Sequence, residues 1–294
     1  MKSLSGHMPY QVMYVDAMNL LTRDYHGMSD LEYHGKKTGM LYGLSRLFIA
    51  WRRKSPGMKF VMIWEGKDSW RKARWPIYKA KRVTRSPEES KVFWGCIDQI
   101  KEVLPIMGIS QVWSHTYEAD DVVWNIAQIE ERKAVYSSGD WDWWPLIDYG
   151  DILYQHKNML TTEMMQAMFA KKFNTRPVDP SRMWLFKILC GDPSDTVSGI
   201  PRFLKKVAAE LCNLGGVDET TIVQGLVRLG EKKWAQKVLD HEWVLDRNLE
   251  LLCPSAISQE DMEWIESDYS EAEFGEVLLK SGMEILYDRF MEVK

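Results

Sequence analysis

The sequence predicts an α/β fold in which helices flank a central, mostly parallel, twisted sheet, with a helical region after it. Two observations predict this fold. Short β-rich runs alternate with helical stretches in the first part of the chain, a pattern typical of βαβ units that place helices on both faces of a sheet. After about Asn158 the pattern changes to helices alone.

The predicted strands are short runs, and each lies next to turn residues. They are residues 11–16, 59–65, 110–115, 133–137 and 151–155. Because helices separate these runs, we expect the strands to be joined by crossover connections and to lie mostly parallel in one sheet.

The predicted helices carry their own signals. The stretch 39–54 has apolar residues at the 3, 4 and 7 spacing that forms one helix face. Ser86, Pro87 and Glu89 mark a helix start, with serine as the N-cap, proline in the first helical position and glutamate three residues after the cap. Further along the chain we expect helices at 162–173, 180–190 and 201–212.

We place a domain boundary near residue 160. Residues 1–160 form the α/β domain, with a basic arm at 66–86, and residues 161–294 form the helical region. The acidic tail, 217–294, contains 18 Asp/Glu and 8 Lys/Arg, a net charge of −10. Residues 36–91 contain 16 Lys/Arg and 4 Asp/Glu, a net charge of +12. The net charge of −4 therefore hides a basic block, which indicates a local site for a polyanion.

Several classes of protein are excluded. Apolar runs of only a few residues are too short for a membrane span, which needs about 20. Residues 1–12 lack the apolar core of a secretory signal. The four cysteines lie far apart, without a C-x-x-C pair, which favours a reduced, cytoplasmic protein over a disulfide-rich or zinc-binding one.

Acidic residues follow four of the predicted strands. They are Asp16, Glu65, the group Glu118, Asp120 and Asp121, and the pair Asp140 and Asp142; Asp192 and Asp195 add two more from the helical region. The carboxyl ends of parallel strands meet at one edge of a sheet, so we expect these side chains to converge on one cleft. The alternative is structural, because a single Asp at a strand end commonly forms a turn or caps a helix.

Such a group of carboxylates needs a counter-charge. Carboxylates within a few ångströms repel one another unless they are protonated or neutralised by cations. Oxygen ligands favour Mg²⁺, with Mn²⁺ as a substitute, over zinc. Two metal ions about 3.5–4 Å apart are a recurrent device for hydrolysing phosphodiesters. The residues alone therefore predict a metal-dependent phosphodiesterase.

The basic arm combines cations with aromatic rings. Its residues 70–85 interleave Lys and Arg with Trp70, Trp75 and Tyr78. Such a segment suits single-stranded nucleic acid, because the charges follow the phosphates while the rings stack on bases. The alternative is a solvated loop with buried aromatic residues.

Five motifs in order, from about residue 11 to 212, resemble the 5′-nuclease family of flap endonucleases and 5′–3′ exonucleases, and most of all its small stand-alone bacteriophage enzymes. They are Val15-Asp16-Ala-Met-Asn19, Tyr78-Lys79-Ala-Lys-Arg82, Glu118-Ala-Asp120-Asp121, Gly139-Asp140-Trp-Asp142 and Gly191-Asp192-Pro-Ser-Asp195. The resemblance implies a PIN-like nuclease domain followed by a helix–three-turn–helix-like element at 183–212 that grips duplex DNA.

The resemblance also implies roles for the site residues. A first metal site would use Asp16, Glu118 and Asp120, with Asp121 close by, and a second would use Asp140, Asp142, Asp192 and Asp195. Lys79 and Arg82 would engage the scissile phosphate, as catalytic residues. The nucleic-acid contacts would come from the arm and from the C-terminal element, through Arg71, Lys72, Arg74, Tyr78, Lys81, Arg85, Arg202, Lys205 and Lys206.

Two departures from the family pattern stand out. The family usually has Asp after the second strand, where this chain has Trp64-Glu65. With a one-residue gap Glu65 serves as a metal ligand; without it Trp64 aligns and the ligand is lost. The glycine-rich turn of the family is replaced by Gly199-Ile-Pro-Arg202-Phe-Leu204, which leaves a potassium-assisted duplex contact open and favours phosphate binding by side chains.

We therefore expect a monomeric, Mg²⁺-dependent 5′-nuclease that acts on DNA with 5′ single-stranded ends, flaps or nicks and on RNA–DNA hybrids, for example in an infected bacterial cell. The alternatives are a PIN-type endoribonuclease and a catalytically impaired, structure-specific DNA-binding factor. For the acidic tail we expect helices that pack on the body through Trp264, Ile265 and 277–279; a basic replication protein is the alternative partner.

Overall fold

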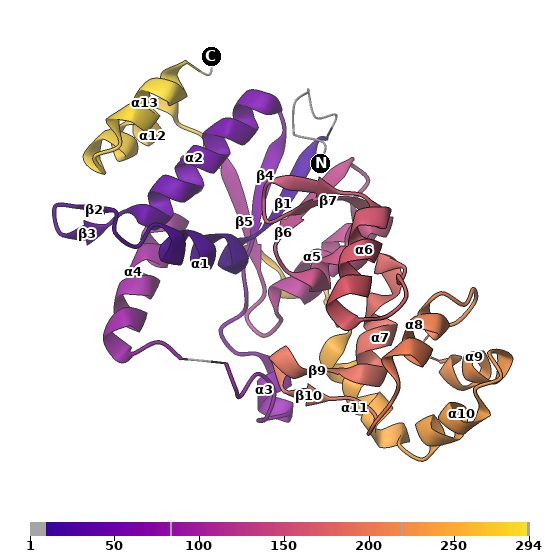
Figure 1. The fold of residues 1–294 in the computed structure, drawn as a ribbon. Helices are drawn as coiled ribbons and strands as arrows, with labels where there is room; N and C mark the ends of the chain where they lie inside the picture. The colour runs from indigo at the N-terminus through magenta and orange to yellow at the C-terminus, as the bar shows by residue number, and fades with distance from the viewer. Residues whose placement is uncertain (1–9, 83, 219, 293–294) are drawn as a thin grey trace.

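The computed structural model describes residues 10–82, 84–218 and 220–292. A seven-stranded sheet forms the centre of the molecule, in the order β11-β5-β4-β1-β6-β7-β8 (Figure 1). Its five inner strands are parallel, and β8 and β11 pair antiparallel at the two edges. The strands are β1 (Val12–Asp16), β4 (Lys59–Ile63), β5 (Ile109–Trp113), β6 (Ala134–Ser138), β7 (Gly150–Tyr154), β8 (Asn158–Leu160) and β11 (Glu263–Ile265).

The predicted α/β fold and its parallel sheet are thus confirmed, and each of the five predicted strands lies within two residues of the observed bounds. The inner strands are buried on both faces, which explains their nearly continuous apolar sequences. Val12 and Tyr14 of β1 pack in one core, whereas Met13 and Val15 pack in the other, because successive side chains of a strand point to opposite faces.

Thirteen α-helices surround the sheet in the described chain. Before the middle of the chain they are α1 (Ala17–Gly27), α2 (Gly39–Lys54), α3 (Trp70–Arg74), α4 (Pro87–Val103) and α5 (Ala119–Ile129). After it they are α6 (Thr162–Phe173), α7 (Met183–Cys190), α8 (Lys205–Cys212), α9 (Ile222–Arg228), α10 (Lys232–Leu239), α11 (Glu242–Leu252), α12 (Glu271–Lys280) and α13 (Glu284–Met291). None of them is long and apolar enough to cross a membrane.

Most helix predictions are confirmed. Helices α2 and α6 have the predicted bounds, and α4 begins with the predicted capping box, in which Ser86 Oγ accepts from the Glu89 amide at 3.2 Å and the Glu89 carboxylate accepts from the Ser86 amide at 3.1 Å. The segment 180–190 is a short 3₁₀ turn followed by α7.

Two predictions in the C-terminal region are wrong. The helix expected at 201–212 begins only at Lys205, because the amide of Phe203 bonds to the carbonyl of Ile200 in a turn that places Arg202 at φ +56°. Trp264 and Ile265 belong to the edge strand β11 rather than to a helix, and their side chains are 45% and 41% exposed. The expected packing through 277–279 is present in part, because Leu278 of α12 is buried with Phe274 in the same core as Phe48 of α2, and Val277 packs against that core.

Short elements complete the fold. A small hairpin, β2 (Glu32–Tyr33) and β3 (Lys36–Lys37), joins α1 to α2, and a second pair, β9 (Gly191–Asp192) and β10 (Val197–Ser198), follows α7. Figure 1 shows α3 and the rest of the basic arm below the sheet, facing β9, β10 and α7. The division near residue 160 stays a prediction, although β11 returns from the helical region to the sheet.

Candidate active site

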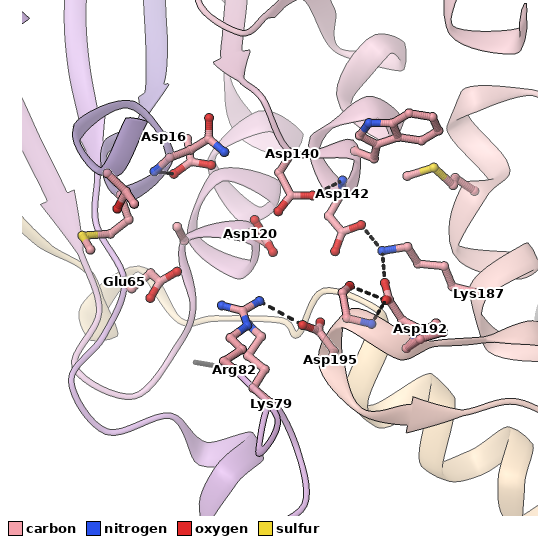
Figure 2. A pocket seen from close by; sticks show the side chains of 18 of the residues that line it. Asp16, Glu65, Lys79, Arg82, Asp120, Asp140, Asp142, Lys187, Asp192 and Asp195 are labelled. Carbon is pink, nitrogen blue, oxygen red and sulfur yellow. Dashed lines mark hydrogen bonds and ion pairs between the residues drawn. The ribbon is translucent and has the colours of Figure 1, made fainter. Parts of the chain in front are cut away.

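A cleft of about 740 Å³ lies at the carboxyl ends of the parallel strands. Seven of the nine predicted acids line it, and six cations from the arm, α1, α6 and α7 lie around them (Figure 2). The acids are Asp16, Glu65, Asp120, Asp140, Asp142, Asp192 and Asp195, and the cations are Arg23, Lys79, Arg82, Arg85, Lys172 and Lys187. The convergence expected from the parallel sheet is therefore present.

Neighbouring strands hold Asp16 and Asp140 in fixed positions. Asp16 ends β1 and caps α1, where it accepts from the Asn19 amide at 3.0 Å and from Ser138 Oγ at 2.7 Å. Asp140 follows β6, and its amide donates to the same Ser138 hydroxyl at 2.9 Å. Between them the Gly139 amide donates to Asn19 Oδ1 at 2.8 Å, so the two strand ends are tied together.

These carboxylates lack enough positive charge around them. Burial raises the pKa of Asp16 to about 7, although Ser138 and the Asn19 amide act to lower it. Burial, and then the charge of Asp142, raises the pKa of Asp140 to about 6. The pKa of Asp120 is raised as well, by burial and by Asp140 and Asp142. A divalent cation bound among these carboxylates would offset both the cost of burying their charges and the repulsion between them.

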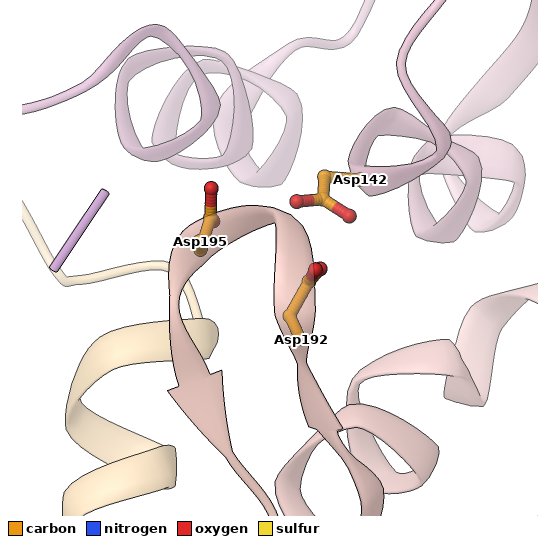
Figure 3. A group of neighbouring side chains, drawn as sticks. All are labelled: Asp142, Asp192 and Asp195. Carbon is orange, nitrogen blue, oxygen red and sulfur yellow. The ribbon is translucent and has the colours of Figure 1, made fainter. Parts of the chain in front are cut away.

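A second group lies on the other side of the cleft. Asp142, Asp192 and Asp195 each offer an oxygen, and the three oxygens lie within 4.8 Å of one another (Figure 3). A cation of this chain already contacts two of them, because Lys187 Nζ lies 2.7 Å from Asp192 Oδ2 and also bonds to Asp142. Burial acts to lower the pKa of Lys187, but Asp142 and Asp192 outweigh it and raise the pKa.

The sequence reasoning missed Lys187. Its only signal is a single cation in the apolar stretch Met183–Cys190, and a buried lysine is rarely found without an acidic partner. Trp94 on α4 was missed too. Its side chain is 50% exposed and lines the cleft, which makes it an aromatic surface that a nucleobase can reach.

Two of the predicted acids lie behind the cleft with partners of their own. Asp121 Oδ1 accepts from Arg71 Nη2 at 2.7 Å and from the Ser255 amide at 2.7 Å, and its Oδ2 accepts from Arg71 Nη1. Glu118 accepts from Lys79 Nζ at 2.8 Å and from the Tyr78 hydroxyl at 2.9 Å. Burial acts to raise the pKa of Glu118, but Lys79 and Arg71 lower it overall. Neither carboxylate lacks a counter-charge.

The residues of the basic arm also divide into a buried set behind the cleft and a set that is exposed or lines the cleft. Arg71 and Tyr78, expected to contact nucleic acid, are each only 3% exposed, because they form this internal cluster with Asp121 and Glu118. Lys72, Arg74 and Lys81 are exposed, and Arg85 lines the cleft. Lys79 and Arg82 reach across the cleft, where Arg82 Nη2 bonds to Asp195 Oδ1 at 2.9 Å.

The structure shows where the side chains at the two departures from the family pattern, Trp64-Glu65 and the turn at 199–204, are placed. Trp64 is 2% exposed and its indole nitrogen donates to Gln111 at 3.1 Å, whereas Glu65 lines the cleft near Asp16 and Arg82. The turn at 199–204 leaves Arg202 exposed, together with Lys205 and Lys206 at the start of α8.

Comparison with known proteins adds independent findings. The family model described as "5′-3′ exonuclease, N-terminal resolvase-like domain" matches residues 11–174. The chain is 25% identical over 292 residues to a thermostable DNA polymerase I of Thermus filiformis, and 29% identical over 231 residues to the DNA polymerase I of Mycobacterium bovis. These matches cover 94% and 74% of this chain but only 34% and 25% of the polymerases.

A shorter relative is similar in size. The 5′-3′ exonuclease of Mycoplasmopsis pulmonis is 26% identical over 211 residues, which cover 71% of this chain and 68% of the relative. Among solved structures, the bacteriophage T5 D15 protein co-crystallised with metal ions is similar with a TM-score of 0.58 at 18% identity, covering 96% of this chain and 97% of the other. The Rad2 catalytic core in complex with a DNA substrate is similar with a TM-score of 0.56 at 15% identity, covering 97% and 92%.

The structural likenesses, at these identities, establish a shared fold. The family match extends over more than half of the chain and includes the cleft residues Asp16, Asp120 and Asp140. The chain therefore belongs to the 5′-3′ exonuclease family.

Proposed function

We propose that this chain is a divalent-metal-dependent 5′-nuclease that hydrolyses phosphodiester bonds in DNA with 5′ single-stranded ends, flaps or nicks, and in RNA–DNA hybrids. One observation carries the proposal: seven carboxylates converge in a cleft that the basic arm spans. Family membership supports the reaction class, and relatives whose structures contain metal ions or DNA support the cofactor and the substrate.

The cleft lining offers carboxylates for two metal ions, and among the described residues one set, Asp142, Asp192 and Asp195, has its oxygens within 4.8 Å of one another. Asp16, Asp120 and Asp140, with Glu65 beside them, would hold one, and Asp142, Asp192 and Asp195 would hold the other. We favour Mg²⁺, or Mn²⁺ in its place, because all of these ligands are carboxylate oxygens. When bound, such ions supply a water of lowered pKa and stabilise the leaving oxygen.

Lys79 and Arg82 would bind the scissile phosphate. Burial acts to lower the pKa of Lys79, but Glu118 and Asp195 raise it, which favours the charged ammonium that a phosphate would bind. In the structure Lys79 pairs with Glu118 and Arg82 with Asp195. An arriving phosphate would replace these carboxylates as their partner, which places the substrate's negative charge beside the metal ligands.

The alternatives have less support. The catalytically impaired factor rested on the Glu65 departure, and Glu65 lies in the cleft. A PIN-type endoribonuclease has no need for the exposed basic residues Arg202, Lys205 and Lys206, which suit the backbone of a duplex. The turn at 199–204, which has Arg202 and Leu204 where the family has small residues, gives no support for a potassium ion there.

A substrate panel tests the proposal. Purified protein is incubated with end-labelled 5′-flap DNA, nicked duplex, blunt duplex and single-stranded RNA in Mg²⁺, with EDTA as the control. We expect Mg²⁺-dependent products from the 5′ end of flap and nicked DNA. Cleavage of RNA alone, undiminished cleavage in EDTA, or binding of flaps without cleavage would each overturn it. Asp140→Asn protein, carried through the same steps, excludes a contaminating nuclease.

A further inference from the structure

A row of lysines on aromatic rings leads out of the cleft. Lys172 Nζ lies 4.0 Å from the ring centre of Trp141, and Lys172, Trp141 and Phe173 all line the cleft. Lys205 at the start of α8 lies 5.4 Å from the ring centre of Phe173. Lys205, an exposed cation of the C-terminal element, is therefore joined to the wall of the active site by a single ring, that of Phe173.

The row continues onto α10. Phe203, in the turn before α8, packs against Trp234 of α10 with ring centres 5.0 Å apart. Lys233 and Lys237 lie 5.8 and 5.4 Å from the centre of the Trp234 ring. Figure 1 shows α8, α9 and α10 side by side at the lower right of the molecule. Packing of Trp234 thus fixes the lysines of α10 beside the turn that carries Arg202.

The local charge supports one kind of partner. Residues 201–206 and 231–237 together contain six Lys/Arg and one acid, Glu231. The remainder of the acidic tail, outside 231–237, contains 17 acids and 5 Lys/Arg, a net charge of −12. Helix α10 is therefore a basic segment within an acidic region, and it lies at the end of the series of lysines and rings that starts at the cleft.

We propose that α10 and Lys172 extend the duplex-binding surface, so that a DNA backbone runs from the cleft across α8 to Lys233 and Lys237. The proposal rests on the nuclease function and names where the duplex arm of the substrate lies. It also accounts for the unusual turn. Arg202 adopts the left-handed conformation that glycine favours, and its exposed side chain, with the lysines of α10, supplies charge where backbone amides would otherwise approach the phosphate.

Lysine ammonium groups bind phosphates as point charges and carry no information about the bases. The surface should therefore hold duplexes of any sequence, and its contribution should depend strongly on salt. Each phosphate contact that is lost lowers the slope of log K against log salt by about 0.9.

The test compares Lys233→Gln/Lys237→Gln with the parent chain. Binding to a labelled duplex with a 5′ overhang and to the overhang strand alone is measured in EDTA, which prevents cleavage, from about 50 to 200 mM salt. For the duplex we expect a salt slope lower by about 2, since two contacts are lost. For the single strand we expect the parent's slope and affinity.

Two further variants make the result specific. Lys233→Arg/Lys237→Arg keeps both charges and should restore the duplex slope. Lys54→Gln/Lys280→Gln removes two exposed lysines from α2 and α12, away from the cleft, and should bind as the parent does. An unchanged duplex slope, an equal loss on single strands, or the same loss in this control would overturn the proposal. Parent cleavage of flaps in Mg²⁺ is scored separately, so failure of the nuclease function is distinguishable.

Discussion

The open cleft and the closed ion-pair cluster behind it are built from the same residue types, and the contrast is sharpest between Asp120, which other acids crowd in the cleft, and Asp121, which pairs with Arg71 in the cluster. Asp120 and Asp121 are adjacent in the first turn of α5, yet Asp120 faces the cleft and Asp121 faces Arg71. The pKa of Asp120 is raised by burial and neighbouring acids. Asp121, in contrast, accepts hydrogen bonds from a guanidinium and a backbone amide.

The difference separates Asp121, a structural acid, from its neighbour Asp120, which faces the cleft. A carboxylate with a full set of donors stabilises the native state by itself, whereas a crowded carboxylate without a counter-charge costs stability until a cation arrives. The same substitution, Asp to Asn, should therefore have opposite consequences on the two sides of α5.

Asp121→Asn should lower the free energy of unfolding by about 3 kcal/mol, because it removes the acid that Arg71 binds through both of its terminal nitrogens and leaves Glu118, at 3.6 Å, to balance the buried guanidinium. Urea unfolding of the metal-free protein, followed by circular dichroism, measures the change. The double variant Arg71→Met/Asp121→Leu removes both charges and should recover most of the loss. If Asp121→Asn alone were as stable as the parent, the ion pair of Arg71 with Asp121 would not stabilise the fold, and the contrast between the cluster and the cleft would fail.

Asp120→Asn should reduce the cleavage rate on 5′-flap DNA by at least about 100-fold, a size typical for removal of one electrostatic group from an active site. Its metal-free stability should equal or exceed that of the parent, because one of several crowded charges is gone. Single-turnover cleavage in Mg²⁺ and urea unfolding in EDTA give the two values. A stable variant with the parent's rate would remove Asp120 from the metal centre.

The sequence predicts the open cleft better than the closed cluster. Parallel strands place their carboxyl ends together, so acids after β1, β5 and β6 converge for a reason that the β-rich runs already contain. The ion pair of Arg71 with Asp121 joins residues 50 positions apart, and the contact of Lys187 with Asp142 joins residues 45 apart. Neither contact is indicated by a local pattern in the sequence. Motif matching therefore grouped Asp121 with the metal ligands and left out Lys187.

The edge strand β11 shows the same limit in the fold. Residues 263–265 have no strong strand signal of their own, and they become a strand because β5 offers an unpaired edge. The left-handed Arg202 is a second case, since a turn that usually needs glycine formed with arginine. The strand β11 and the conformation of Arg202 both depend on contacts with other parts of the folded chain.

The smallest predicted effect is a pH dependence confined to the cleft. Burial raises the pKa of Asp16 to about 7 from an ordinary value of about 4, so the folded protein binds this proton more tightly than the unfolded chain does. The stability from Asp16 is fully present below about pH 4 and is lost as the pH rises through 7. Asp16→Asn does not titrate, and its one amide oxygen can still accept from the Asn19 amide in place of Asp16 Oδ1.

In EDTA, Asp16→Asn should therefore be more stable relative to the parent at pH 8 than at pH 5, by at least about 1 kcal/mol, the size of a shift of one pKa unit. Burial lowers the pKa of His156 to about 3, so the unfolded chain binds that proton more tightly below pH 6.5, and the pH dependence from His156 is opposite to that from Asp16. This contribution is the same in the parent and in Asp16→Asn, so it cancels when the two proteins are compared. Urea unfolding at both pH values measures the difference. An equal effect of the substitution at pH 5 and pH 8 would show that Asp16 is as well neutralised as Asp121, and the contrast between cleft and cluster would then rest on geometry alone.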